Sequence, residues 1–344
     1  MHPKAKGYLA ALTACVIWGG SFVATKVALL SFTPHGLLAL RFAMACAILV
    51  PAFLVFQREV LRLRDLGLFC LLGFMEPGLY FLCETRGLLY TSASVASLII
   101  GSIPVFVMLL ASIFLKEPLH LRTALGTAMT LVGIAFLVHK DLAAASVGTS
   151  PLKGNLLMMG AALCASVYTI VSRSLSARYR PMTLTTIQAT FATVFFTLLA
   201  FTDGSFVVLS PLSTSALSSL IFLGVLATLG AFWLYNFSLS ILPASQVAVL
   251  INLIPLVTVL SARALLNETL SWAQLVGALF ILAGVRVSTS SPQGAERKGF
   301  FKILQVLRSK SRRAHGGFPL AAPQQHIDGS SPAIPRSGAG KGQY

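Results

Sequence analysis

The sequence predicts an all-α polytopic membrane protein with ten transmembrane helices, arranged as two inverted five-helix repeats with both termini in the cytoplasm. Three observations predict this fold: a shortage of charge, ten apolar runs of near-spanning length, and an internal repeat. Charged residues make up 10% of the 344 residues and apolar ones 56%, whereas soluble domains carry about 25% charged residues. The mean hydropathy of +0.82 indicates that lipid is the main solvent of the chain.

The apolar runs end at charge clusters and at Pro/Gly-bearing linkers, and about 20 residues are needed for each crossing. The predicted helices of the first repeat, within residues 1–145, are 8–31, 35–56, 66–87, 92–115 and 121–138. Those of the second repeat, within residues 146–290, are 153–173, 181–201, 214–238, 244–266 and 272–290. The first run is too long for a signal peptide and lacks a cleavage site, so we expect it to be retained.

Lys and Arg concentrate in cytoplasmic loops of membrane proteins, so loop charge predicts orientation. The loops on the side of the N-terminus carry Lys4, Lys6, Arg58, Arg62, Arg64, Lys116, Arg122, Arg178 and Arg180, whereas the opposite loops carry Arg86, Lys140 and Lys153. Both termini are therefore expected on the cytoplasmic side of the membrane. The same distribution explains the net charge of +16 without nucleic-acid binding.

An internal repeat appears when the chain is shifted against itself by 151 residues. "ASVASLIIGSIPVFVMLLASIFLKEPL" from Ala93 then lies on "ASQVAVLINLIPLVTVLSARALLNETL" from Ala244, with 13 identities in the 42 positions from Ala93 to Ile134. A shift of 147 residues pairs Gly7 with Gly154 and Pro34 with Pro181. Because each half has an odd number of helices, the second half must enter the membrane in the opposite orientation. Inverted halves with a midplane solute site are typical of secondary transporters.

Several segments resemble the EamA-type drug/metabolite transporter superfamily. They are "IWGGSFVATK" in the first helix, the "TSAS" to "P" to "LKEPL" to "G" run, and the "PAS" to "P" to "LNETL" to "G" run. The resemblance covers residues 7–288 and implies a ten-helix transporter with a central cavity, often an exporter of small solutes from bacteria. It does not select among amino acids, metabolites, drugs and sugars.

Intramembrane charge is costly and marks a candidate functional site. Glu76, Tyr80 and Glu84 follow one another at i, i+4 and i+8, which predicts one polar stripe on the third helix. Arg41 on the second helix falls at a matching depth, and Lys26 also lies in the outer half. Three interpretations stay open: a buried ion-pair network that joins helices, a solute site, and a proton-coupling site at Glu76 or Glu84. The shifts pair Lys26, Arg41, Glu76 and Glu84 with Arg173, Gln188, Ala227 and Tyr235, so the acidic feature belongs to one half.

Other candidate site residues follow from the internal repeat and from their predicted depth in the membrane. Pro104 and Pro255 occupy equivalent midplane positions, where proline frees a carbonyl one turn earlier. They predict either tight packing with a kink or broken helices that line a cavity, with Ser97 and Asn252 as polar neighbours. Further candidate cavity residues at central depth, each with a packing alternative, are Trp18, Phe22, Tyr80, Tyr168, Trp233 and Asn236. Glu117 and Glu268 precede helices five and ten, where a carboxylate favours the positive helix end.

The sequence contains no HExxH, GxSxG or GxxxxGK motif, so we expect no catalytic site, metal, ATP site or other cofactor. Residues 291–313 include seven Lys/Arg between Arg297 and Arg313, which predicts a basic amphipathic segment on the anionic inner leaflet. Residues 314–344 are rich in Gly, Pro, Ser and Gln and are expected to be disordered.

These observations predict a secondary transporter that exports a small organic solute, such as an amino acid or related metabolite, by alternating access. Protons are the candidate coupling ion. Two alternatives remain: a facilitative carrier without ion coupling, and a membrane sensor or accessory subunit that binds a solute without moving it. The sequence does not indicate the oligomeric state.

Loop charge and helix number make a topological prediction. Reporters fused after residue 290 should report the cytoplasm, and reporters inserted in the loop from Lys140 to Lys153 should report the opposite side. A C-terminus outside the cytoplasm would contradict the ten-helix count and remove the argument for inversion.

Overall fold

The computed structural model describes residues 2–57, 59–144, 151–204, 212–266 and 272–289. Its first set of helices is α1 Pro3–Ala28, α2 Pro34–Phe56, η1 Leu63–Asp65, α3 Leu66–Gly73, η2 Phe74–Leu79, α4 Tyr80–Gly87, α5 Ala93–Ile100, α6 Ile103–Phe114 and α7 Leu121–Ala144. The second set is α8 Pro151–Leu175, α9 Pro181–Thr202, α10 Thr214–Ile221, η4 Phe222–Gly230, α11 Ala231–Ile241, α12 Ala244–Leu250, α13 Leu253–Leu266 and α14 Trp272–Thr289. The part of the chain described by the structure contains no strand, as an all-α membrane protein requires. The predicted segments 291–313 and 314–344 lie outside it.

Eight helical stretches of the described residues are long and apolar enough to cross a membrane. They include α1, α2, α9, and the composite stretches Leu63–Gly87 and Thr214–Ile241. Two apolar stretches, Leu121–Phe136 in α7 and Leu275–Ser288 in α14, are shorter. The chain is therefore a polytopic helical membrane protein, and each predicted apolar run coincides with one of these stretches.

The helices begin where their sequences supply a start signal. Proline occupies the first turn of α1, α2 and α9, a position where its missing N–H needs no partner. Ser92 and Ser213 accept hydrogen bonds from the backbone N–H groups of Val95 and Ala216 at the starts of α5 and α10. Such caps satisfy donors that the first helical turn leaves free.

Four of the predicted helices are interrupted near their middles. The run 66–87 breaks at Glu76, whose φ of −145° and ψ of 113° are not helical, and continues through the π-helical turn η2. The run 214–238 contains the longer π-helical segment η4. Gly101–Ser102 separates α5 from α6 and Ile251–Asn252 separates α12 from α13, in each case just before Pro104 or Pro255. Three of the four interruptions lie next to a proline, Pro77, Pro104 or Pro255, which removes a regular helical hydrogen bond. The segment η4 contains no proline.

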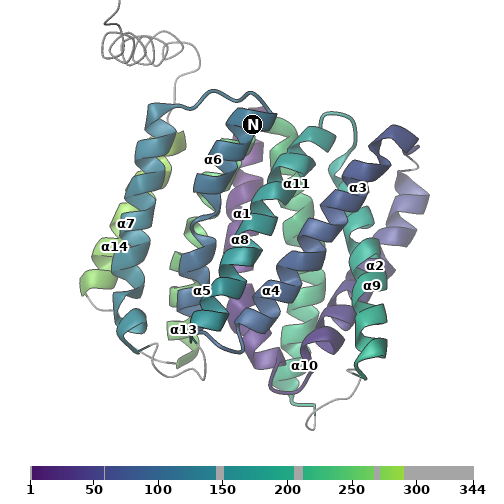
Figure 1. Cartoon of the computed structure of the whole chain (residues 1–344), viewed down its shortest axis with the longest axis horizontal. Helices are drawn as coiled ribbons and strands as arrows, with labels where there is room; N and C mark the ends of the chain where they lie inside the picture. The colour runs from purple at the N-terminus through teal and green to yellow at the C-terminus, as the bar shows by residue number, and fades with distance from the viewer. Residues whose placement is uncertain (1, 58, 145–150, 205–211, 267–271, 290–344) are drawn as a thin grey trace, which may run out of the picture. The chain divides into compact units, whose positions relative to one another are not determined.

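Helices α7 and α14 lie side by side at one edge of the bundle (Figure 1) and pack through glycines. A Cβ atom added at Gly126 would lie 2.5 Å from the carbonyl oxygen of Gly284, and one at Gly133 would lie 2.7 Å from that of Gly277. Each glycine is seven residues from the next on its own helix. Small residues at this spacing let two helix backbones approach closely in a membrane.

Each of the main contacts between the two sets of helices has a counterpart, in which the equivalent helices of the opposite sets pack on each other. Helix α1 packs on α11 and α13, and α8 packs on α4 and α6; α2 packs on η4, and α9 packs on η2. A Cβ atom added at Gly7 on α1 would lie 3.1 Å from Leu242, and one added at Gly154 on α8 would lie 3.1 Å from Thr91. The shifts of 147 and 151 residues convert the first of these contacts into the second.

Polar contacts place the helix starts at the two ends of the bundle. Tyr8 at the start of α1 donates a hydrogen bond of 2.8 Å to Gln246 at the start of α12. Thr91, after α4, donates one of 3.1 Å to Asn155 at the start of α8. In Figure 1 the N-terminus, where α1 begins, is marked at one end of the bundle, whereas α8 begins at the opposite end.

The α7–α14 contact gives a stability prediction. Gly126→Ala should lower the free energy of unfolding by about 1–3 kcal/mol, the usual cost of overpacking, because the new methyl group meets backbone that cannot move aside. Gly67→Ala is the matched control, since nothing lies within 4 Å of the added Cβ. Thermal unfolding of both variants in detergent tests this, and equal midpoints would contradict the tight glycine contact.

Candidate functional site

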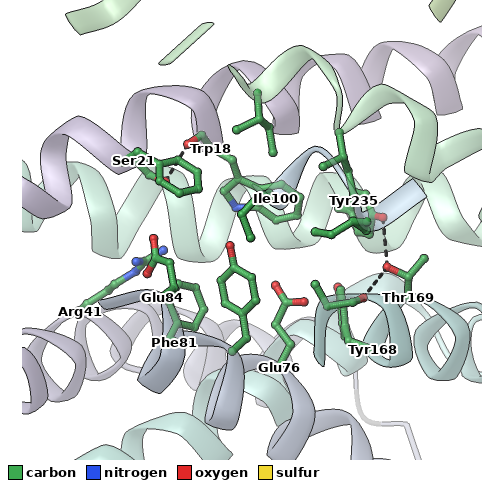
Figure 2. Close-up of a pocket in the computed structure, with 16 residues that line it drawn as sticks. Trp18, Ser21, Arg41, Glu76, Phe81, Glu84, Ile100, Tyr168, Thr169 and Tyr235 are labelled. Atoms are coloured by element: carbon green, nitrogen blue, oxygen red, sulfur yellow. Dashed lines mark hydrogen bonds between the residues drawn. The ribbon is translucent and has the colours of Figure 1, made fainter. Parts of the chain in front are cut away.

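A cavity lies where the interrupted helices meet (Figure 2), and it encloses about 30 Å³. This volume has room for about two water molecules. Its sixteen lining residues come from both sets of helices: Trp18, Ser21, Phe22, Arg41, Glu76, Tyr80, Phe81, Glu84, Ile100, Ile103, Ala165, Tyr168, Thr169, Tyr235, Ile251 and Ile254. The four isoleucines flank the breaks between α5 and α6 and between α12 and α13.

The predicted ionisable cluster lines this cavity. Arg41, Glu76 and Glu84 are 2%, 5% and 2% exposed, and Tyr80 is 9% exposed. Figure 2 shows the carboxylates of both glutamates pointing into the cavity. The predicted stripe is not one regular helical face, because the main chain breaks at Glu76. The side chains converge nonetheless.

The two carboxylates have different surroundings. The guanidinium of Arg41 lies beside Glu84 in Figure 2, and its Coulombic attraction to Glu84 exceeds that to Glu76. Arg41 also donates through Nε to Thr228 Oγ1 at 2.6 Å and lies 4.4 Å from the centre of the Phe81 ring. The Glu76 carboxylate accepts no hydrogen bond from any residue that the structure describes. Glu84, by contrast, accepts a hydrogen bond of 3.3 Å from the Thr85 hydroxyl.

The charges of the cavity do not cancel when all three groups are ionised. Two carboxylates and one guanidinium leave a net charge of −1 in a site that is shielded from water. A buried charge without a partner costs several kcal/mol. The cavity therefore favours the binding of one positive charge, which a proton or an organic ammonium group can supply.

Aromatic side chains form much of the remaining wall. The indole N–H of Trp18 donates to the Ala227 carbonyl at 3.1 Å, and its ring lies 5.1 Å from that of Tyr235. The hydroxyls of Tyr235 and Thr169 are 3.2 Å apart. Such walls combine apolar contact with hydroxyl groups and π faces, which attract cations.

Other candidates from the sequence lie outside the cavity lining. Asn236 is fully buried and hydrogen-bonded to Tyr168, Ser172, Thr185 and Gln188. Asn252, at the break after α12, donates to Thr130 of α7. The remaining three are Ser97, which is buried in α5, Lys26, which is half-buried near the end of α1, and Trp233, which is 41% exposed and stacks on Phe237.

Glu117 contacts a helix that the sequence did not indicate. We expected it to favour the start of the helix that follows it, but its carboxylate accepts hydrogen bonds from the backbone N–H groups of Ala244 and Ser245, at 2.8 and 3.2 Å. It therefore caps α12, in the other set of helices. Glu268 lies outside the described residues.

Eight lining residues were not predicted from the sequence, although the internal repeat carried a signal for all but Phe81: Ser21, Phe81, Ala165, Thr169 and the four isoleucines. The shifts of 147 and 151 residues join six pairs of lining residues: Trp18/Ala165, Ser21/Tyr168, Phe22/Thr169, Glu84/Tyr235, Ile100/Ile251 and Ile103/Ile254. These pairs account for twelve of the sixteen residues. Equivalent positions of the two halves thus face one cavity, with different chemistry on each side.

A helical membrane bundle with an ionisable, aromatic-lined internal cavity is the architecture of a solute transporter. Residues 5–139 and 152–290 both match the EamA-like transporter family, to which the chain belongs. The protein is therefore a transporter, and a multi-pass protein of the bacterial inner membrane.

Relatives span almost the same region. The chain is 30% identical to the uncharacterized transporter YcxC of Bacillus subtilis, over 83% of this chain and 93% of that protein. It is 28% identical to a "Probable amino-acid metabolite efflux pump" of Escherichia coli, over 81% of this chain and 93% of that protein. A solved crystal structure matches with a TM-score of 0.68 at 20% identity, covering 83% of this chain and 98% of the other, which shows a shared fold.

Proposed function

We propose that the protein is a secondary transporter of ten membrane-spanning helices, built from two inverted halves, that exports an amino acid or related metabolite by alternating access. The observation that carries this proposal is the cavity of about 30 Å³, which is lined by equivalent residues of both halves but takes its three charged residues from the first. In secondary transporters built from inverted repeats, the solute binds at such a junction.

Inversion is supported by the exchanged contacts and by the helix starts. A two-fold axis in the membrane plane would convert the contact of α1 with α11 into that of α8 with α4, and it would place the starts of α1 and α8 at opposite ends. The family match to two successive segments also fits a duplicated unit. Under this arrangement α7 and α14 are the fifth and tenth spans, although their apolar stretches are short.

The proposed solute follows from the chemistry of the cavity. An amino acid carries an ammonium group, for which the carboxylate of Glu76 and the nearby aromatic rings provide complementary charge. Its side chain would lie against the isoleucines and Phe22. The efflux pump of Escherichia coli, by its name, handles amino-acid metabolites, which supports the same class.

Polar contacts join the two halves at both ends of the bundle. At the end proposed to be cytoplasmic, Asp65 accepts hydrogen bonds from Arg178 and, at 2.8 Å, from Tyr179. We call this group the inner latch. At the other end, His35 contacts Asp203 and accepts a hydrogen bond of 3.0 Å from Arg86; this group is the outer latch. In this proposal the two latches close opposite ends of the pathway through the cavity of about 30 Å³, and one of them must open before a solute can enter.

The latches predict opposite changes in access. In a protein whose five free cysteines are replaced, Ser21→Cys places a thiol on the cavity wall. Adding Asp65→Asn should raise labelling of this thiol by an impermeant reagent from the cytoplasmic side about fivefold, the effect of losing about 1 kcal/mol of hydrogen bonding. Adding His35→Ala should raise labelling from the opposite side instead. Equal effects on both sides would contradict the assignment of the latches.

Glu76 provides the main functional test. Glu76→Gln keeps the shape and removes the charge, so abundance should stay near wild type while flux falls to background. Flux is measured with proteoliposomes that contain a mixture of radiolabelled amino acids, with and without an imposed pH gradient. Wild-type flux and unchanged pH dependence in a stable Glu76→Gln protein would rule out the functional role.

Glu84→Gln is the matched comparison, because Glu84 has the stronger attraction to Arg41. It should lower abundance, since a buried cation loses its partner, a loss of several kcal/mol. Changing Arg41 to Met as well should restore abundance. If Glu76→Gln rather than Glu84→Gln shows this loss and rescue, Glu76 is the structural partner of Arg41.

The same assay separates the two alternatives. A facilitative carrier would move amino acids at a rate that an imposed pH gradient does not change, whereas a sensor or accessory subunit would bind them without flux. Comparing metabolites in cells with and without the gene would identify the solute, because an exporter's substrate accumulates inside cells that lack it.

A further inference from the structure

Asn236 is the centre of a buried hydrogen-bond network behind the cavity wall. Its Oδ1 accepts bonds of 2.9 Å from the Tyr168 hydroxyl and 2.7 Å from Ser172. Its Nδ2 donates bonds of 3.0 Å to Thr185 and 2.9 Å to Gln188. An amide side chain has two N–H donors and an oxygen with two lone pairs. Asn236 uses all four, which fixes its orientation.

Gln188 extends this network to the broken turn at Glu76. Its Nε2 donates a bond of 3.2 Å to the backbone carbonyl of Glu76. In a regular helix that carbonyl would accept from the N–H of Tyr80, but this N–H bonds to Met75 and Pro77 instead. The Gln188 side chain therefore satisfies a buried carbonyl that the break leaves without its helical partner, which is a costly group to leave unpaired.

The donor and acceptor roles in this network are fixed in sequence, from the backbone carbonyl of Glu76 to the hydroxyl of Tyr168. The Glu76 carbonyl can only accept, so Gln188 must turn its NH₂ group toward it and its Oε1 toward Asn236. Asn236 then presents Oδ1 to the hydroxyl of Tyr168. One hydrogen-bonded unit thus holds both the main chain of Glu76 and the phenol of Tyr168, and both residues line the cavity.

We call the contact of Gln188 with the π-helical segment η2 a brace. An equivalent brace supports η4, which carries no carboxylate. Arg41, which the 147-residue shift pairs with Gln188, reaches from α2 to Thr228 in η4. Thr228 is paired by the 151-residue shift with Pro77, the residue after Glu76. Each second helix therefore braces the π-helical segment of the opposite half. The Gln188 brace holds the segment that carries Glu76.

We infer that Gln188 and Asn236 are positioning residues: they hold Glu76 and Tyr168 as one unit and so set where the carboxylate stands in the cavity. This inference rests on the function proposed for Glu76. Neither residue is expected to contact the solute.

The test compares Gln188→Met with Thr186→Val. Met keeps the length of the side chain and loses both hydrogen bonds. Thr186 is the matched control, because it is also buried on α9 and its hydroxyl bonds only to Met182 of the same helix, at 2.8 Å. Purified variants in liposomes are treated with N,N′-dicyclohexylcarbodiimide, which reacts with protonated carboxyl groups in apolar surroundings. Mass spectrometry then gives the labelling of Glu76 relative to Glu84, and radiolabelled amino acids give the pH profile of flux.

Gln188→Met should change the Glu76-to-Glu84 labelling ratio by about threefold or more, the size expected when one neutral hydrogen bond is lost. The pH profile of flux should shift, while Thr186→Val changes neither. An unchanged ratio and profile in a stable Gln188→Met protein would overturn the inference. If that variant fails to accumulate, Gln188→Asn is used, which is too short to reach both partners. Failure of both variants would show that Gln188 is needed for folding and would overturn the inference as well.

Labelling does not depend on transport. A wild-type protein without flux, but with a labelling ratio that Gln188→Met changes, would contradict the proposed function and leave the positioning role standing.

Discussion

Burial of one guanidinium and two carboxylates inside an apolar bundle is the constraint on which the rest of the structure depends. These groups are almost fully buried beside a cavity with room for about two water molecules. Charge in the membrane interior costs several kcal/mol unless it is paired or hydrogen-bonded. Arg41 meets this cost through Glu84, Thr228 and the Phe81 ring. Glu76 receives support at its backbone but not at its carboxylate. This difference in surroundings is the basis for the proposal that Glu76, and not Glu84, acts in transport.

Duplication explains how such a site can arise from simple helices. Six pairs of equivalent residues face the cavity, so both halves contribute the same positions. The residue types differ in four of the six pairs; Glu84, for example, has Tyr235 as its counterpart, and Trp18 has Ala165. The duplicated backbone provides the breaks and the braces, whereas substitution in one half provides charge. The positions that line the cavity are thus nearly symmetric while its charge is strongly asymmetric.

Much of the fold could be predicted from the sequence because helix limits depend on local signals. Apolar runs, Pro in first turns and Ser caps act over a few residues, and the predicted runs coincide with the described helices. The cluster of Arg41, Glu76 and Glu84 was also predictable, since buried charges must find one another. The break at Glu76 was not, because an i, i+4, i+8 pattern also fits an unbroken helix. Trp233 shows a similar limit: its position along the helix gave its depth but not the direction in which it points.

Contacts between the halves were the least predictable part. Glu117 caps α12, more than a hundred residues away along the chain, and Gln188 supports the carbonyl of Glu76 across a similar separation. No local pattern specifies such partners. The repeat held part of this information, because a contact in one half implies its exchanged counterpart. It could be used only once one member of each pair was known.

Counterflow tests the central claim most directly, namely that one cavity opens alternately to the two sides. Proteoliposomes are loaded with an excess of unlabelled amino acids and diluted into a trace of the same labelled mixture. Alternating access predicts that label transiently accumulates inside above its equilibrium level, because each outward step with unlabelled solute returns the cavity to the inside with labelled solute. Entry that rises to equilibrium without an overshoot would indicate a continuous pathway and contradict the account.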